Sequence, residues 1–310
     1  SKWFWYIKSL YFFQDNTFKD LSSYPYNDFH PHFGSFIWAF FRKISFNQYE
    51  YFGRLFYLFL YLGSIILITS NLFKKNIYNA IIFLIIIIIN YKYYYLSGLQ
   101  EVLLFSLLII ISKLILNYII FRNILYLYFV ALSLNLIIWT KAEGIAFFAI
   151  TILCINLIKK LNFNHRIKFN ILTLLLLVFK IAIFKIYNVK LNNQPYYFDY
   201  IASLNLDIII YKVVNISTYF LYHSLTNIIL LLLPVILLLK FKKIFNDEFL
   251  KFNFYFYILN IIFIFSAYLL RDMEIVYSLK TTIDRLIFAS SGFYLLLIID
   301  YFKKLSYRII

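Results

Sequence analysis

Four short polar segments interrupt a chain that is otherwise rich in Ile, Leu and Phe, and they hold the residues that could do chemistry. The first segment contains Asp28, His30 and His32 within one turn, beside two of the four prolines. A carboxylate and two imidazoles this close together could bind a divalent cation or a phosphate. The alternative is that they are ordinary polar loop residues facing water.

The second and third segments place carboxylates and a lysine at the ends of apolar runs. Glu101 follows Ser97-Gly98-Leu99-Gln100, and Lys141 and Glu143 lie between two apolar runs. If these apolar runs cross a membrane, ionisable residues at their ends lie near the membrane surface and are candidates for a functional site. Two alternatives remain: Glu101 is a helix-start carboxylate favoured by the helix dipole, and Lys141 with Glu143 is an ion pair in a helical hairpin.

The fourth segment contributes two arginines, Arg271 and Arg285. Their guanidinium groups match phosphate oxygens and could clamp a phosphate or pyrophosphate. Snorkelling of arginine at helix ends is the alternative. The sequence has no Walker loop, no GxGxxG, no HExxH and no GxSxG, so motifs of other common chemistries are missing.

The composition explains which elements must position these residues. Of the 310 residues 63% are hydrophobic and 14% are charged, whereas soluble domains have about 45–50% and about 25%. This excludes an ordinary soluble enzyme, a disordered chain and a nucleic-acid-binding domain, and it predicts a polytopic membrane protein. The single cysteine, Cys154, excludes a disulfide framework and a cysteine-based metal site.

The apolar runs predict an all-α fold, a transmembrane helical bundle of about nine spans, each near the roughly 20 residues that cross the hydrocarbon. The expected spans are about 52–73, 77–91, 99–119, 124–140, 144–158, 167–187, 219–240, 252–270 and 286–302. We divide the chain into a first outer loop, 1–51, and the bundle, 52–310. The outer loop is expected to hold helices lying in the membrane interface, at 3–13 and 35–46.

Charge asymmetry between alternate loops predicts the orientation. The loops after the first, third, fifth, seventh and ninth expected spans hold most of the lysines and arginines, and only Asp247 and Glu248 as acids. By the positive-inside rule this side is cytoplasmic. Residues 1–51 and the four polar segments then lie outside. Nine spans from an outside start suggest one further span upstream of Ser1, so we expect the chain to be N-terminally truncated.

In their order along the chain, these segments resemble the GT-C fold glycosyltransferases. The most similar group is the bacterial one related to dolichyl-phosphate-mannose protein mannosyltransferases and lipid A aminoarabinose transferases. YPYNDFHPHFGSFIWAFF is similar to their Tyr-Pro…His-Pro segment, EYFGRLFYLF places Arg54 at their next helix start, and SGLQEVLLFSL places Glu101 in their acidic second-loop motif. The Lys-x-Glu-Gly hairpin at 141–144 adds to a resemblance that covers about residues 1–160.

The resemblance implies transfer of a sugar from a polyprenyl-phosphate donor to a lipid, glycan or protein acceptor, at the periplasmic face of the bacterial inner membrane. No nucleic-acid partner is expected, because of the composition and the charge distribution, and a divalent cation, Mg²⁺ or Mn²⁺, with unknown ligands stays open. The acidic pair that serves as base in the family is absent here and would lie upstream. The expected catalytic residues are Asp28 and Glu101. The expected substrate-binding residues are Lys8, His30, His32, Arg54, Lys141, Glu143, Arg271 and Arg285.

Two further interpretations stay open: a transporter or lipid flippase, and a non-catalytic membrane subunit. A transporter predicts charged residues midway through helices, for which Lys113 and Lys180 are the candidates. An enzyme predicts instead that Asp28, His32, Glu101, Lys141 and Glu143 converge on one cavity at the outer membrane surface.

Overall fold

The computed structural model describes residues 2–17, 20, 32–70, 72–90, 98–158, 161–189, 205–271 and 274–309. Within these ranges the regular structure is helical and no strand occurs, as the apolar runs predict. The helices are α1 Lys2–Phe13, α2 Phe33–Ile44, α3 Phe52–Thr69, α4 Asn76–Ile89, α5 Gln100–Phe121, α6 Ile124–Thr140, α7 Gly144–Asn156, α8 Phe163–Ile186, α10 Leu206–Thr226, α11 Ile228–Leu239, α12 Glu248–Leu269 and α13 Ile275–Ile309.

The number of membrane spans is lower than the nine expected. Five helices, α3, α5, α8, α12 and α13, are long and apolar enough to cross a membrane, and α10 with α11 would make a sixth as one bent span. The apolar helices α4, α6 and α7 have only 14, 17 and 13 residues. The structure therefore supports a helical membrane protein with five to six candidate spans, and not the full set of nine.

The expected seventh span, 219–240, is not one continuous helix, because the helix breaks inside it. α10 already begins at Leu206, in the expected outer loop, and α11 leaves it at an angle of 94°. The side chain of Asn227 accepts hydrogen bonds from the backbone amides of Ile229 (3.1 Å) and Leu230 (3.2 Å), so it starts a new helix. Asparagine is among the strongest N-cap residues, and this local bonding outweighs the continuous apolar run.

The last expected outer loop is also largely helical. α13 begins at Ile275 and has 35 residues, so Arg285 lies in its third turn and does not open a span at 286. At a rise of 1.5 Å per residue the helix is about 52 Å long. Ser278, Thr282 and Arg285 thereby come to one helical face, with the spacing of neighbours on successive turns.

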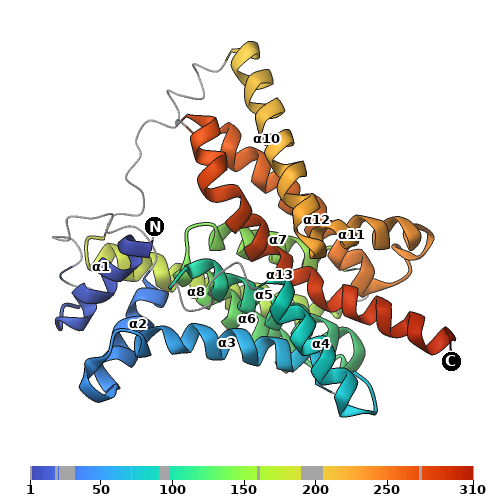
Figure 1. Ribbon diagram of the computed structural model, residues 1–310, viewed down its shortest axis with the longest axis horizontal. Coiled ribbons are helices and arrows are strands. Elements are labelled where there is room, and N and C mark those ends of the chain that lie inside the picture. Colours follow the sequence, from blue (N-terminus) through green and yellow to red (C-terminus); the bar gives the residue numbers. More distant parts are fainter. Residues whose placement is uncertain are drawn as a thin grey trace.

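α5 and α13 pack against each other along the centre of the bundle (Figure 1). A Cβ atom at Gly292 would lie 2.4 Å from the backbone oxygen of Phe105, so only glycine permits the observed approach of the two backbones. The rings of Phe105 and Phe288 stack with centroids 4.6 Å apart. This close contact fixes the register between the second turn of α5 and the fourth and fifth turns of α13.

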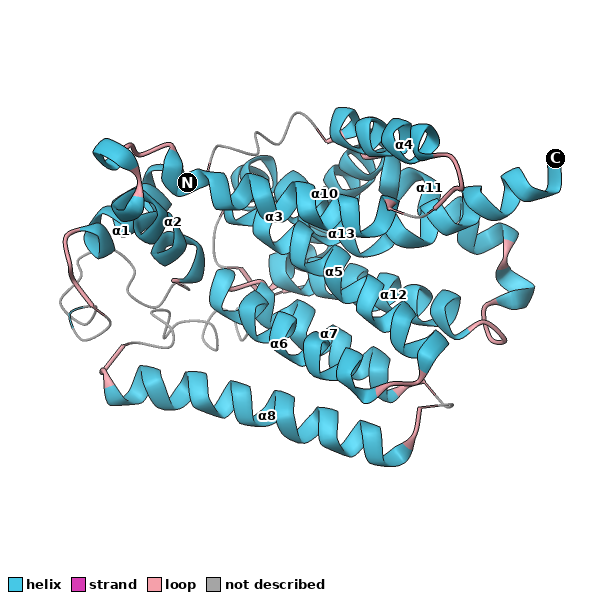
Figure 2. Cartoon of the chain, turned by 90° about the horizontal axis from the view of Figure 1, so that it is seen from below, coloured by secondary structure: helices cyan, strands magenta, loops and turns pink. Residues whose placement is uncertain are grey.

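α1 and α2 pack together at one end of the bundle, and the C-terminal end of α13 lies at the other (Figure 2). α1 and α2 correspond to the two helices expected in the first outer loop. Their location in the membrane interface stays a prediction. Trp38 of α2 is fully buried, and Cβ atoms at Gly53 and Gly98 would lie 2.1 and 2.2 Å from its ring. Gly98 has φ +74°, a conformation that favours glycine. Trp38 thus ties α2 to α3 and to the turn before α5.

Candidate active site

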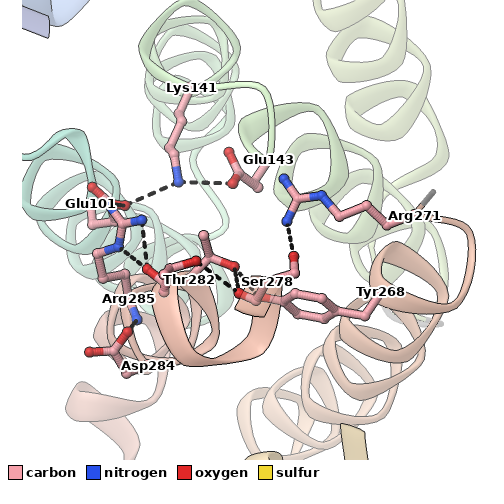
Figure 3. A network of polar contacts seen from close by, with 10 residues as sticks. Glu101, Lys141, Glu143, Tyr268, Arg271, Ser278, Thr282, Asp284 and Arg285 are labelled. Atoms are coloured by element: carbon pink, nitrogen blue, oxygen red, sulfur yellow. Dashed lines mark hydrogen bonds and ion pairs between the residues drawn. The ribbon is translucent and has the colours of Figure 1, made fainter. Parts of the chain in front are cut away.

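Lys141 lies between two carboxylates at the end of the bundle where α5 begins (Figure 3). Its Nζ is 3.1 Å from Oε1 of Glu101 and 2.8 Å from Oε1 of Glu143. Glu101 is in the first turn of α5, and Lys141 and Glu143 flank the turn between α6 and α7. Of the five residues expected to converge, these three, from two separate segments, therefore meet in the structure.

Glu101 is the most enclosed member of this group. Its side chain is only 2% exposed, and Oε1 also lies 3.4 Å from Nη1 of Arg285. The other carboxylate oxygen, Oε2, is buried and has no hydrogen-bond partner among the described residues. One oxygen of Glu101 thus contacts two cations, and the second can still accept a hydrogen bond.

Two close backbone approaches hold this arrangement in place. A Cβ atom at Gly144 would lie 2.2 Å from the backbone oxygen of Ile137, so the hairpin between α6 and α7 is tightly closed. That closure brings Lys141 and Glu143 together. On the other side, the contact of Gly292 with Phe105 carries Arg285, two turns earlier on α13, to Glu101 on α5.

A second layer of polar residues extends from α12 and α13 (Figure 3). Nη1 of Arg271 donates a hydrogen bond of 2.7 Å to Oγ of Ser278, and the hydroxyls of Tyr268 and Thr282 are 2.7 Å apart. Sequence reasoning missed Tyr268, Ser278 and Thr282. The helical spacing of Ser278, Thr282 and Arg285 is a signal that could identify them, but the many polar residues of this segment favour a loop.

Lys212 of α10 holds the backbone at Arg271 by hydrogen bonds. Its Nζ donates to the backbone oxygens of Arg271 (2.8 Å) and Leu269 (3.2 Å), at the C-terminal end of α12. A cation is favoured at a helix C-terminus, where carbonyl groups lack partners within the helix. The end of α12, and with it the direction of Arg271, therefore depends on α10.

The two charges in the α6–α7 turn stabilise each other. Burial lowers the pKa of Lys141, but the carboxylates of Glu143 and Glu101 outweigh burial and hold that pKa above its ordinary value. Burial raises the pKa of Glu143, and the Lys141 ammonium outweighs it, so the net pKa lies below the ordinary value. At neutral pH Lys141 is a cation and Glu143 an anion.

The other expected site residues are not seen in this group. Asp28 and His30 lie outside the described residues. His32 is buried with its ring centroid 6.0 Å from those of Phe12 and Phe184, so the expected meeting of His32 with Glu101 is not observed. Its helix is nevertheless close, since a Cβ atom at Gly34 would overlap the side chain of Gln100.

Lys8 and Arg54, the remaining expected substrate-binding residues, lie in α1 and α3. Lys8 is fully buried. Arg54 pairs with Glu50 and lies over the rings of Tyr51 and Trp38, 4.5 and 5.2 Å from the centroids. The described contacts of Arg54 thus join α3 to α2, and none of them reaches Glu101.

The group offers carboxylates and cations rather than a metal centre. Within the described ranges no three His, Cys, Asp or Glu side chains come together in a way that could hold a metal ion. The Lys141 ammonium occupies the space between Glu101 and Glu143 that a cation would need. What the arrangement can do is accept a proton or hydrogen bond at Glu101 and contact an anion through Arg285, Lys141 and Arg271.

Comparison of the chain with protein-family models, with curated proteins and with solved structures finds no match.

Proposed function

We propose that this chain is a membrane glycosyltransferase that moves a sugar from a polyprenyl-phosphate donor to a lipid, glycan or protein acceptor. The observation that carries the proposal is the Glu101 group. Two carboxylates and the cations Lys141 and Arg285 meet from α5, α6, α7 and α13, with Arg271 close by. Charged residues at the end of an apolar bundle cost free energy unless they contact water, a partner or a ligand.

The proposed reaction uses these two kinds of group separately. The acceptor hydroxyl loses its proton to a carboxylate, its oxygen bonds to the anomeric carbon of the sugar, and the bond from that carbon to the phosphate oxygen breaks. The phosphate leaves on the polyprenyl chain with the bonding electron pair. Arg285, Lys141 and Arg271 supply the positive charge that stabilises this departing oxygen.

The carboxylate that takes the proton is assigned to Glu101 or Asp28. Support for Glu101 comes from Oε2, which is buried and free to accept a hydrogen bond. Asp28 lies in the segment that leads into α2, and α2 packs at the start of α5 beside Gln100. The long apolar helices offer surfaces for the isoprenoid chain. We place the site at the periplasmic face of a bacterial inner membrane.

The broken α10–α11 pair is the observation that most favours a transporter, because transporters bind substrate at the N-termini of interrupted helices. Here, however, the side chain of Asn227 already accepts hydrogen bonds from the first amides of α11. Lys180 in α8 donates to the backbone oxygen of Ile138 at 2.6 Å, which is a structural use of a buried lysine. We therefore rank transport second.

The test is sugar transfer in proteoliposomes. The purified chain is incubated with a panel of radiolabelled polyprenyl-phosphate-linked hexoses and pentoses and total membrane lipid, and donor consumption is measured. We expect at least one donor to be consumed and Glu101→Gln to lower the rate by about 10²-fold or more. Glu274→Gln removes an exposed acid from the same end of α13 and is the matched control.

If no donor is consumed, the proposal fails for the chain as given. If a donor is consumed equally by Glu101→Gln and by the unchanged chain, the enzyme class stands and the role of Glu101 is rejected. Asp28→Asn then tests the other carboxylate in the same assay.

A further inference from the structure

A cavity of about 580 Å³ opens at the end of the bundle opposite the Glu101 group. It lies between the C-terminal parts of α5, α11 and α13 and the start of α12. Ile119 of its wall is 18 residues after Glu101 on α5, which corresponds to about 27 Å along the helix. That separation is close to the roughly 30 Å thickness of the hydrocarbon core. The two sites thus belong to opposite membrane surfaces.

The cavity has an apolar wall and a basic rim. Leu116, Ile236 and Leu297 are among the residues of the wall, and Lys240, Lys243 and Lys304 carry the rim. A second cavity of about 540 Å³ adjoins it, lined by Arg122, Lys243 and Asn246 among others. Lys243 faces both cavities.

The acids at the rim are already used by neighbouring groups. Oδ1 of Asp247 accepts the backbone amides of Phe249 and Leu250, both at 3.0 Å, and caps α12. Asp300 pairs with Lys304 at 2.6 Å within one helical turn. The three lysines outnumber the two acids of the lining, Asp247 and Asp300, so the rim keeps a net positive charge.

The positive charges of Lys240 and Lys243 have few partners within the protein. Lys240 lies over the ring of Tyr301, 5.2 Å from its centroid. The ammonium of Lys243 is exposed and has no hydrogen bond or ion pair within the described part of the chain. Their charge is therefore available to an anion that enters the cavity.

We propose that this cavity binds the phosphodiester headgroup of an anionic phospholipid, with an acyl chain lying along Leu116, Ile236 and Leu297. A basic pocket between transmembrane helices, with an apolar wall that continues toward the hydrocarbon, matches such a lipid in both charge and polarity. A soluble anion would use the rim alone and gain nothing from the wall. The inference does not depend on the glycosyltransferase proposal, because it concerns other residues at the other membrane surface.

The test compares phospholipids on the purified, full chain. In detergent micelles, phosphatidylglycerol and phosphatidylcholine are titrated in turn, and bound lipid is counted by native mass spectrometry. We expect phosphatidylglycerol to bind at least about tenfold more tightly, since each lysine near a headgroup contributes about 1 kcal/mol. Lys240→Gln with Lys243→Gln should remove this preference.

Matched variants exclude a general effect of charge. Lys74→Gln with Lys75→Gln removes two exposed cations from the same end of the bundle without touching the cavity, and should keep the preference. Lys240→Arg with Lys243→Arg keeps the charge and should keep it too. The inference is overturned if the two lipids bind equally, if the Lys74/Lys75 pair loses the preference as fully, or if inorganic phosphate competes as well as phosphatidylglycerol.

Discussion

The Glu101 group and the lysine-rimmed cavity use charge in opposite ways. In the Glu101 group each described cation faces a carboxylate or hydroxyl, and the side chains of Glu101 and Lys141 are only 2% and 15% exposed. At the cavity the rim is open, and the side chain of Lys304 is 65% exposed even though it is paired. Buried charges need partners in fixed places, whereas exposed charges are stabilised by water.

This difference predicts how each region meets a ligand. A phosphate that enters the Glu101 group has to share Lys141 and Arg285 with Glu101, so its binding must reorganise existing pairs. A headgroup that enters the cavity breaks no ion pair of Lys240 or Lys243 among the described residues. We therefore expect the Glu101 group to discriminate strictly between ligands, because its own charges compete with them. We expect the cavity to accept a wider range of headgroups.

The largest effect is expected when Lys141, the cation shared by Glu101 and Glu143, is removed. Lys141→Met leaves Glu101 and Glu143 facing each other without their shared cation and should lower stability by about 3–5 kcal/mol, as for other buried pairs that lose one partner. Lys240→Met at the open rim should cost less than about 1 kcal/mol. Thermal unfolding in detergent, followed by loss of the monodisperse peak in size exclusion, measures both. Similar losses for the two variants would contradict the distinction between the regions.

The next effect concerns the packing that joins the two regions. Gly292→Ala places a methyl group against the backbone of Phe105, should push α13 away from α5 and lower stability by about 1–3 kcal/mol. Gly63→Ala is the control in a helix interior, because nothing lies within 4 Å of its Cβ position. There alanine should raise stability by about 0.5–1 kcal/mol. A neutral Gly292→Ala would show that the close approach is unimportant.

A smaller effect appears in the pH dependence. Because Lys141 holds the pKa of Glu143 below its ordinary value, Glu143 adds stability above its unfolded pKa of about 4.3 and loses it as the pH falls through the lower, folded value. Thermal midpoints of the unchanged chain and of Glu143→Gln should therefore differ at pH 7 and approach each other in acid. A difference that is constant from pH 7 to pH 3 would mean that Lys141 does not act on this carboxyl.

The smallest effect is expected at the cavity end. Arg122 and Glu248 lie 2.7 Å apart and tie the end of α5 to the start of α12, but the Arg122 side chain is 41% exposed. A double-mutant cycle with Arg122→Gln and Glu248→Gln should give a coupling of less than about 1 kcal/mol, reduced further by high salt. Coupling that is larger and insensitive to salt would place this pair with the buried charges of the other end.

The sequence predicted the helical class and much of the Glu101 group for a clear reason. Long apolar runs leave few interpretations, and Glu101, Lys141 and Glu143 are charged residues at the ends of such runs, where antiparallel neighbours bring helix ends together. Arg285 was also named as a site residue, although in the wrong kind of segment. The segment that begins at Ile275 contains enough polar residues to look like a loop.

What the sequence did not predict depends on contacts made by the backbone. The break at Asn227 follows from one side chain that bonds to two amides, and composition does not show it. Lys180 lacked a matching acid and was a candidate for transport, whereas its partner is the backbone oxygen of Ile138. Any apolar residue can offer a backbone oxygen, so residue types alone cannot reveal such a partner.

The shortness of α4 has a consequence for the lipid around the molecule. With 14 residues it is about 21 Å long, and only Ile86 among its side chains is buried, so most of its surface is open to its surroundings. A hydrocarbon layer of about 30 Å cannot match that length without a local change. If α4 spans the membrane, the bilayer beside it would have to thin or draw headgroups inward toward Lys74 and Lys75, whereas the 35 residues of α13 are long enough for the full thickness. The protein would then be surrounded by a membrane of uneven depth, with its thinnest part on the α4 side.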